Sequence, residues 1–129
     1  MFTPAVLITG GFGAKKLAEI YHPERNSYCK LVDLPENRRH HTQDGDLLCG
    51  GWGKYMYSGR SCRRWNPDTG GWDLVTDSLI EERAEHISWT PVDGTVTYLM
   101  GGHDSPSASD VIDNHNNIAR ASFPINKTR

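Results

Sequence analysis

The stretch Leu47–Gly51 reads Leu-Leu-Cys-Gly-Gly, a short apolar run that ends in two glycines. The same pattern occurs before it at Val6–Gly11 and after it at Tyr98–Gly102. The three glycine doublets are Gly10-Gly11, Gly50-Gly51 and Gly101-Gly102. Their first glycines are 40 and 51 residues apart. A short apolar run bounded by turn residues is typical of a strand buried on both faces, so the doublets indicate a β-structure that repeats along the chain.

The segments between the doublets repeat as well. Pro23 is followed 44 residues later by Pro67, and Tyr28 is followed at the same offset by Trp72. Two further pairs share an offset of 45 residues, namely Arg38 with Arg83 and His41 with His86. Because several residue types recur in one order, we interpret the chain as successive copies of one structural unit.

Turn residues mark the other strand ends of this unit. Asp44-Gly45 and Asp93-Gly94 each precede a doublet, and Asp-Gly favours a two-residue hairpin turn because it tolerates positive φ. Pro23 and Pro67 each end the strand that follows a doublet and open a turn into a strand with an aromatic residue. The unit therefore is a four-stranded antiparallel meander. Units of about 45–50 residues with four strands are typical of β-propeller blades, where glycine allows neighbouring blades to approach closely.

Glycine doublets followed by spaced Tyr and Trp residues resemble the kelch repeats, a family of β-propellers. The resemblance covers nearly the whole chain and gives the doublet glycines and Trp72 structural roles. The order of four motifs is similar to that in kelch-repeat proteins of invertebrate animals: Cys49-Gly50-Gly51, Ser61-Cys62, Gly71-Trp72 and His86-x-Ser88-Trp89. The resemblance implies an all-β fold, a kelch-type β-propeller fragment of about three four-stranded antiparallel blades.

The repeat boundaries divide the chain into three expected blades. We expect blade 1 at about residues 6–38 without its first strand, blade 2 at about 39–79, and blade 3 at about 85–123. Propellers close with about 4–8 blades, so three blades leave two sheet faces open. Three alternatives follow: further sequence completes the ring, the chain associates with itself to complete a propeller, or it is a truncated fragment with no independent activity.

Composition excludes several classes of function. The chain has 129 residues, which suits one domain, with 36% hydrophobic residues and a net charge of −2. A net charge near zero argues against nucleic-acid binding. No apolar run approaches the roughly 20 residues of a membrane-spanning helix, so we expect no membrane partner. The first ten residues lack the basic start of a signal peptide.

Three cysteines leave at least one that is free or paired outside the chain. Cys49 and Cys62 are expected on adjacent strands of one blade, 13 residues apart. They form either a cross-strand disulfide or two reduced core thiols. A disulfide would indicate an oxidising compartment. Together with the glycosylation pattern that begins at Asn126, it favours an extracellular location.

The candidate binding residues come from loops on one face of the expected propeller. In an antiparallel blade, the loop after the second strand and the loop after the fourth strand emerge on the same face. Arg, Tyr and Trp dominate the energetics of protein interfaces. The candidates are Arg38, Arg39, Trp52, Lys54, Tyr55, Tyr57, Arg60, His103 and Asp104. The alternative is that these loops are ordinary solvated loops and that Arg38 and Arg83 form internal pairs with Glu or Asp.

We expect no catalytic residues, bound metal or cofactor. The sequence contains no zinc-ligand spacing, no nucleophile elbow and no recognisable Ser-His-Asp order of a catalytic triad. The resemblance instead implies a non-catalytic binding module that presents its loop face to a protein partner. The alternative is a propeller piece that binds carbohydrate or resembles the copper radical oxidases found on some kelch-type propellers.

Overall fold

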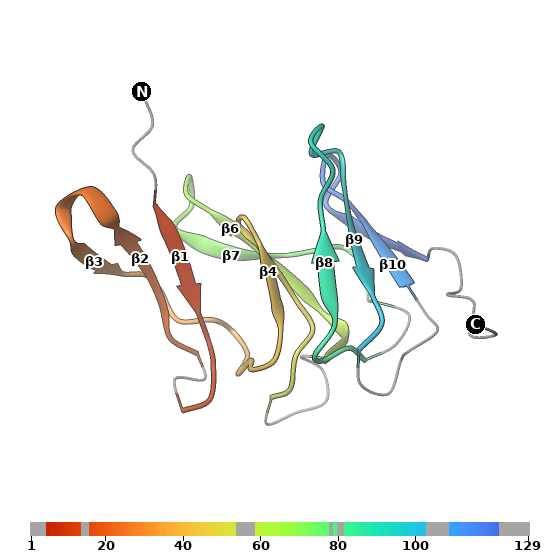
Figure 1. Cartoon of the computed structure of the whole chain (residues 1–129), viewed down its shortest axis with the longest axis horizontal. Helices are drawn as coiled ribbons and strands as arrows, with labels where there is room; N and C mark the ends of the chain where they lie inside the picture. The colour runs from red at the N-terminus through yellow and green to blue at the C-terminus, as the bar shows by residue number, and fades with distance from the viewer. Residues whose placement is uncertain are drawn as a thin grey trace.

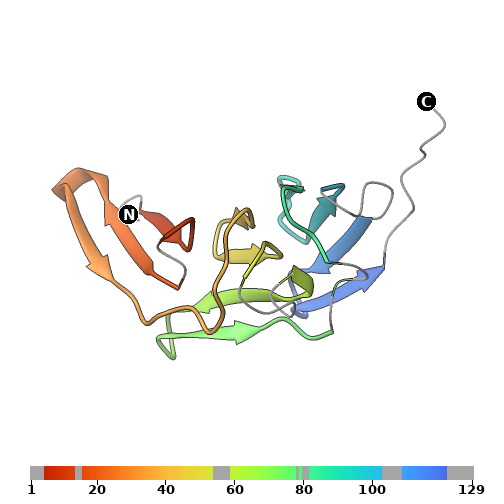
Figure 2. The ribbon, with the colours of Figure 1, turned by 90° about the horizontal axis from the view of Figure 1, so that it is seen from below.

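The computed structural model describes residues 5–13, 16–53, 59–77, 79, 82–102 and 109–121. In this part of the chain, three antiparallel sheets of three or four strands follow one another (Figure 1). Figure 2 shows that the sheets stand side by side in chain order along an arc. The predicted all-β fold of successive antiparallel sheets is confirmed.

Sheet 1 consists of β1 (Val6–Thr9), β2 (Ala18–His22) and β3 (Ser27–Lys30), paired in that order. Pro23 opens the turn between β2 and β3, as predicted, because its fixed φ suits the start of the short 3-10 helix η1 (Pro23–Arg25). Asn26 ends this turn with a left-handed φ of 46°. Tyr21 and Tyr28 then lie opposite each other on β2 and β3, with ring centroids 4.7 Å apart.

Sheet 2 consists of β4 (Thr42–Asp44), β5 (Leu47–Cys49), β6 (Cys62–Asn66) and β7 (Gly71–Leu74). The hairpin loop between β4 and β5 contains Gly45 and Asp46, because Asp44 pairs with Leu47. The turn therefore begins one residue later than the predicted Asp44-Gly45 turn. The turn after Pro67 is ordered by the Asn66 side chain, whose oxygen accepts a hydrogen bond of 2.9 Å from the backbone N–H of Asp68.

Sheet 3 consists of β8 (Ile87–Trp89), β9 (Val96–Met100), β10 (Ser109–Asp113) and β11 (Ile118–Ala121). Asp113 orders the turn between β10 and β11. Its side chain accepts hydrogen bonds of 3.0 Å from the backbone N–H groups of His115 and Asn116. Thus the third and fourth strands of sheets 2 and 3 are joined by turns that use the same Asx chemistry.

The hydrophobic core lies between the sheets rather than within any one of them. The junction of sheets 1 and 2 contains buried Ala18, Leu34, Leu48 and Trp72. The junction of sheets 2 and 3 contains buried Leu47, Cys49, Cys62, Val75, Leu79, Leu99, Ile112 and Ala119. Sheet 2 therefore buries both faces, whereas sheets 1 and 3 each bury only one face against another described sheet.

Each junction also contains the linker that joins its two sheets. The first linker is residues 31–41, and the second linker comprises the described residues of 75–86. The first glycine of a doublet lies against the following linker. A Cβ on Gly50, where φ is +65°, would collide with the carbonyl oxygen of Arg83 and approach the ring of His86 to 2.9 Å. Gly10 makes the same close approach to the carbonyl oxygen of Arg38. Both positions require glycine because the backbone is left-handed and the neighbouring linker leaves no space.

Gly101 holds the same doublet position in sheet 3 and has a similar φ of +69°. No described atom lies within 4 Å of the site where its Cβ would be. The expectation that this glycine prevents a collision with a neighbouring sheet therefore stays a prediction for Gly101. No described sheet follows sheet 3, so among the described residues only the backbone angle restrains Gly101.

Candidate functional site

A pocket of about 390 Å³ opens at one end of the junction between sheets 1 and 2. Three segments that are distant in sequence form it: the loop after β1, the first linker and the segment after β5. The lining residues of this loop-face pocket are Gly11, Phe12, Gly13, Asn37, Arg38, Arg39, Trp52 and Gly53. The structure thus brings the loop after the second strand of one unit next to the linker after the fourth strand, as predicted.

Backbone hydrogen bonds hold the middle of the pocket in place. The N–H of Arg39 donates to the carbonyl of Trp52 at 2.9 Å, and the N–H of Trp52 donates back at 2.7 Å. This pair forms an isolated antiparallel bridge. Because both backbones are fixed, the two side chains emerge from adjacent, defined positions.

The Arg39 guanidinium lies near two aromatic rings. Its central carbon is 5.3 Å from the ring centroid of Phe12 and 5.8 Å from that of Trp52. Both distances are within the range of cation–π interaction. The His40 ring is a further neighbour of Trp52, at 5.0 Å between centroids. The pocket therefore combines a cation with two aromatic rings within cation–π distance of it.

Two aromatic rings of the pocket are exposed, and two of its polar side chains lack a partner among the described residues. Phe12 is 85% exposed and Trp52 is 38% exposed. Among the described residues, the side chains of Arg39 and Asn37 have no hydrogen-bond or ion-pair partner. A guanidinium that contacts an aromatic face keeps its N–H donors in its own plane, so these donors can still bind an acceptor.

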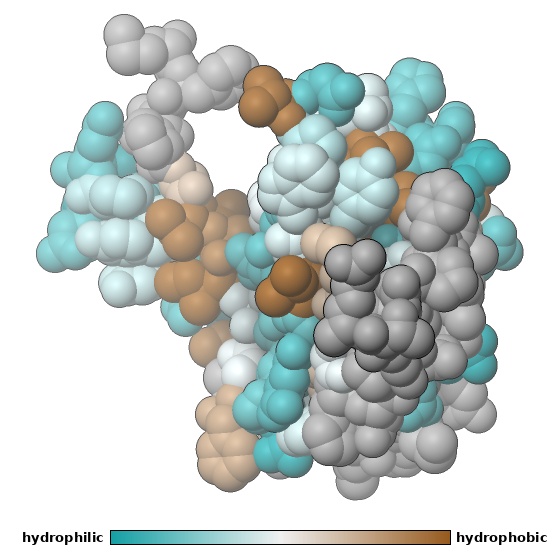
Figure 3. Space-filling model, turned by 45° about the vertical axis from the view of Figure 1, so that its right-hand side comes forward, coloured by the Kyte–Doolittle hydropathy of each residue, from teal (hydrophilic) through white to brown (hydrophobic). Residues whose placement is uncertain are grey.

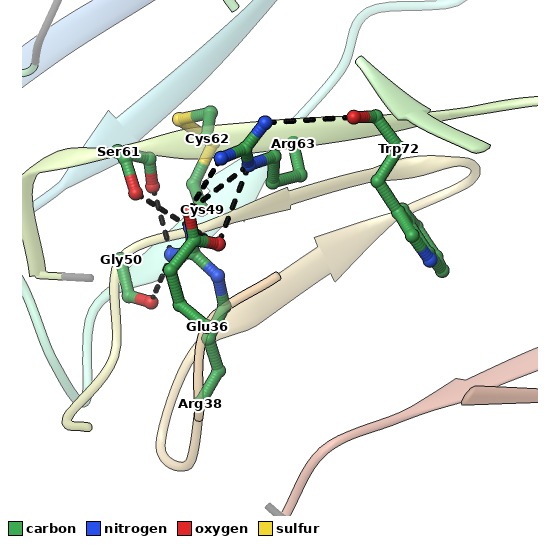
Figure 4. Close-up of polar contacts among 8 residues, drawn as sticks. All are labelled: Glu36, Arg38, Cys49, Gly50, Ser61, Cys62, Arg63 and Trp72. Atoms are coloured by element: carbon green, nitrogen blue, oxygen red, sulfur yellow. Dashed lines mark hydrogen bonds and ion pairs between the residues drawn. A yellow bond between two sulfur atoms is a disulfide. The ribbon is translucent and has the colours of Figure 1, made fainter. Parts of the chain in front are cut away.

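Arg38 does not belong to the exposed binding surface, which corrects the sequence-based prediction for this residue. It is buried, and its guanidinium donates to the carbonyl of Gly50 at 2.8 Å and to the carbonyl of Ser61 at 2.9 Å (Figure 4). The side chain thereby satisfies backbone acceptors of sheet 2. The alternative interpretation, an internal arginine paired with an acidic residue, describes Arg38 correctly.

Glu36 is the acidic partner of Arg38 and also binds a second arginine. It accepts a hydrogen bond of 3.2 Å from Arg38 and a shorter one from Arg63 on β6 (Figure 4). Burial favours the protonated carboxyl, but the hydrogen bond from Arg63 and the charges of both arginines outweigh this effect. The pKa of Glu36 therefore lies below its ordinary value.

The second linker repeats this arrangement with a different acid. Arg83 is buried and donates to the carbonyl of Gly101 at 2.9 Å and to the carboxylate of Asp110 at 2.9 Å. Asp110 on β10 is also buried. Arg38 and Arg83 are thus equivalent residues that fasten each linker to the doublet of the following sheet.

His41 and His86 are equivalent as well, and both contact the preceding sheet. The Nε2 atom of His41 is 2.9 Å from the Thr9 hydroxyl, and that of His86 is 2.7 Å from the Thr42 hydroxyl. Burial and the charge of the neighbouring arginine lower the pKa of each histidine to about 4. Near neutral pH both rings are therefore neutral hydrogen-bonding groups of the junctions. The recurrence of these histidines at one offset thus corresponds to the same hydrogen-bonding role in both junctions.

The other predicted binding residues are separated by the structure. Arg60 donates to the carbonyl of Leu79 from two of its nitrogens, each at 3.2 Å, so it joins the second linker instead of the pocket. Five candidates lie outside the described residues, namely Lys54, Tyr55, Tyr57, His103 and Asp104. Trp72 has the expected structural position, because its indole N–H donates to the carbonyl of Val32 at 3.0 Å.

Sequence analysis missed two side chains of the pocket, those of Phe12 and Asn37, and its glycines Gly13 and Gly53. A signal for Phe12 was present, because an aromatic residue follows the doublet directly both there and at Trp52. Asn37 lies next to the buried Arg38. Its place in the pocket depends on the contact between the first linker and the loop after β1, which the sequence does not indicate.

Cys49 and Cys62 lie opposite each other on β5 and β6, with their sulfur atoms at disulfide distance (Figure 4). The structure therefore supports the disulfide over two separate thiols. The Cys49–Cys62 pair faces the junction of sheets 2 and 3. Cys29 is free and exposed.

The described residues show neither a metal-binding cluster nor a membrane-spanning helix. Within the described ranges, no three His, Cys, Asp or Glu side chains gather in a way that could hold a metal ion. The same ranges contain no helix of the length and apolar character needed to cross a bilayer.

The three antiparallel sheets and their glycine junctions define a propeller-type fold. The chain resembles the solved structure of YjhT, a kelch propeller, with a TM-score of 0.73 and 16% sequence identity. The match covers 98% of this chain and 51% of the YjhT chain, so this chain spans about half the length of YjhT. The likeness shows the fold: an all-β structure that matches half of a kelch propeller. No family model and no curated protein match the sequence.

Proposed function

We propose that this chain is a non-catalytic binding module of the kelch-repeat type that binds a protein partner through the loop-face pocket. The observation that carries the proposal is the Arg39 guanidinium within cation–π distance of two exposed aromatic rings. Arg and Trp are enriched among the residues that dominate protein interfaces. The motif order that resembles invertebrate kelch-repeat proteins also supports a binding role.

The chemistry of the pocket indicates which part of a partner it would bind. Arg39 supplies a positive charge and several N–H donors, which suit a carboxylate. Phe12 and Trp52 supply apolar surface beside that charge. Asn37 adds an amide that can donate and accept. The proposed ligand is therefore a peptide segment in which an acidic group lies next to an apolar side chain.

The test begins with a random peptide library displayed on phage and selected on the purified chain. The affinity of a selected peptide is then measured by calorimetry for the parent chain and for Arg39→Ala and Trp52→Ala. We expect each substitution to weaken binding by about tenfold or more. Arg39→Lys should also weaken binding, because lysine keeps the charge but loses the planar donor geometry.

Arg25→Ala is the matched control, because Arg25 is an exposed arginine in η1 that does not line the pocket. This variant should bind the selected peptide as the parent chain does. Peptides that bind all four variants equally would contradict the assignment of the pocket. If a glycan array yields ligands that depend on Trp52 while no peptide is selected, the carbohydrate alternative replaces the protein partner.

A further inference from the structure

A histidine next to the loop-face pocket, His40, contacts one of the two aromatic rings of the pocket. Figure 3 shows one face of the molecule, on which hydrophilic and hydrophobic side chains lie next to each other. The contact between His40 and Trp52 is of this mixed kind, with ring centroids 5.0 Å apart and planes inclined by 46°. Because Trp52 lines the pocket, a change of charge at His40 acts on a wall of the pocket.

The backbone holds His40 in an uncommon conformation beside its equivalent in the second linker. His40 has a left-handed φ of +55°, and Glu85, 45 residues later, has a φ of +56°. Such angles are uncommon for residues other than glycine, and they cluster at functional sites. The N–H of Glu85 donates to the carbonyl of His40 at 2.9 Å, so the two linkers are joined at these residues.

The side chains of these two residues also meet. The Nδ1 atom of His40 is 3.4 Å from a carboxylate oxygen of Glu85. The two side chains are 43% and 45% exposed, so water reaches the pair. Histidine is the side chain that ordinarily changes charge between pH 5 and 8. The contact is an ion pair when the imidazole is protonated and a polar contact when it is neutral.

Arg39 and Glu85 are the charged side chains that share contacts with His40. Arg39 precedes His40 in the chain, and its guanidinium carbon is 5.8 Å from the centroid of the same tryptophan ring. Arg38 and Arg83 belong to the same two linkers, but their guanidiniums donate to the doublet carbonyls of sheets 2 and 3. A protonated His40 is therefore a second cation on the ring that Arg39 contacts.

Two further histidines of the linkers behave differently. Burial and the neighbouring arginine lower the pKa of His41 and of His86 to about 4. Both rings are therefore mostly neutral at pH values well above 4. Of the three linker histidines, only His40 is exposed.

The two cations on one ring couple protonation to ligand binding. The face of the ring attracts each cation, but the two like charges repel each other. A ligand carboxylate bound at Arg39 reduces this repulsion, so the occupied pocket favours a protonated His40 more than the empty pocket does. Because linkage is reciprocal, protonation of His40 must in turn raise the affinity for the carboxylate. The affinity of the pocket therefore rises as the pH falls.

We infer that His40 makes the loop-face pocket sensitive to pH, so that the pocket binds an acidic peptide segment more tightly when His40 is protonated. His40 is a positioning residue, because it acts through Trp52 and through the charge beside Arg39. The inference rests on the proposed function, since it takes the ligand to be acidic. The expected gain in affinity is about threefold between pH 7.5 and 5.5, because the charges are separated by a ring and partly exposed to water.

The first experiment needs no ligand. Nuclear magnetic resonance follows the indole N–H signal of Trp52 in the isotope-labelled full chain from pH 7.5 to 5.5, and Trp52→Phe identifies this signal. The signal should shift in the parent chain and stay in place in His40→Asn, where asparagine accepts the left-handed backbone. His115→Asn is the matched control, because His115 is exposed in the turn after β10, and it should shift as the parent chain does.

The second experiment measures affinity by calorimetry at pH 7.5 and 5.5. The probe is a selected peptide that requires Arg39 and Trp52, lacks histidine and has blocked ends, so its own charge is constant over this range. The parent chain and His115→Asn should bind it about threefold more tightly at pH 5.5. His40→Asn should bind it equally at both pH values. Circular dichroism at both pH values checks that each variant is folded.

A permanent cation at the same position sharpens the test. His40→Lys should bind the peptide equally at pH 7.5 and 5.5, because lysine stays charged over this range. At pH 7.5 it should bind more tightly than His40→Asn, since only lysine supplies the second cation. Equal affinities of these two variants would overturn the inference.

The remaining outcomes separate the inference from the proposed function. A peptide that requires Arg39 and Trp52 but binds the parent chain equally at both pH values overturns the inference and leaves the binding function in place. An indole signal or an affinity that still responds to pH in His40→Asn also overturns it. If no selected peptide requires Arg39 and Trp52, the proposed function fails, and the inference that rests on it fails as well.

Discussion

Trp72 in sheet 2 and Tyr28 in sheet 1 occupy the same place in the repeat but differ greatly in their surroundings. Trp72 is 9% exposed and donates a hydrogen bond to the carbonyl of Val32 in the first linker. Tyr28 is 61% exposed at the open end of the arc. The comparison shows that the neighbouring sheet, more than the residue itself, determines what a position contributes to stability, as expected for repeat structures.

The largest expected difference comes from truncating these two aromatic residues. Trp72→Ala should lower the free energy of unfolding by about 3–5 kcal/mol, because it opens a cavity in the junction and leaves the Val32 carbonyl unpaired. Tyr28→Ala should cost about 1 kcal/mol or less, since its ring is mostly in water. Urea denaturation at low protein concentration measures both values. Equal losses in the free energy of unfolding would contradict the conclusion that packing at the junction makes Trp72 more important for stability than Tyr28.

A pair of glycine variants tests the same comparison through the backbone. Gly50→Ala should cost roughly 3–4 kcal/mol, because it combines a left-handed backbone with a collision against the Arg83 carbonyl. Gly101→Ala should cost about 1–2 kcal/mol, because among the described residues only the left-handed backbone opposes it. The two variants make the same chemical change at nearly equal φ, so each controls for the other in a thermal or urea unfolding experiment.

The disulfide distinguishes sheet 2 from its neighbours. The equivalent pairs are Thr9 with Ala18 in sheet 1 and Met100 with Ser109 in sheet 3. Replacing both Cys49 and Cys62 by alanine should lower the free energy of unfolding by about 3 kcal/mol, the value expected for a loop of this size. Thiol counting on the denatured, unreduced chain should find only Cys29. Three free thiols after expression in an oxidising compartment would contradict the disulfide.

The buried histidines should make the junctions sensitive to acid. The pKa of His86 is about 4 in the folded chain and near 6.5 in the unfolded chain, so only the unfolded chain gains this proton between these pH values. The free energy of unfolding should therefore fall as pH drops from 6.5 to 4, by roughly 2–3 kcal/mol for this group.

The variant His86→Asn should remove that part of the pH dependence while keeping a polar group near Thr42. His115→Asn is the control, because His115 is exposed in the turn after β10. Urea unfolding at several pH values distinguishes the two variants. A parent chain whose stability does not change between pH 6.5 and 4 would argue against buried, neutral histidines at the junctions.

The repeat could be recognised from sequence because its signals are local. Gly10, Gly50 and Gly101 have left-handed backbones that glycine favours, and Pro23 restricts φ by its own ring. Such residues impose their turn on any surroundings. The sheets and their order therefore followed from the pattern of glycines, prolines and apolar runs.

The site was less predictable because it depends on contacts between segments. Arg38 and Arg39 are adjacent arginines with nothing in their residue type to distinguish them. The structure buries Arg38 against the carbonyls of Gly50 and Ser61 and leaves Arg39 near two aromatic rings. Only the recurrence of Arg83 at an offset of 45 residues indicated that Arg38 had a repeated internal role.

The arginine that fastens each linker has a consequence for how genes of this kind lengthen. Arg83 and its acid Asp110 lie on opposite sides of the point where sheet 3 begins. A duplication that copies only the strands of a sheet would carry the carboxylate away from its cation. For sheet 3, a duplicated segment that keeps this ion pair must therefore begin inside the preceding linker, ahead of Arg83, and is offset from the strands of the sheet.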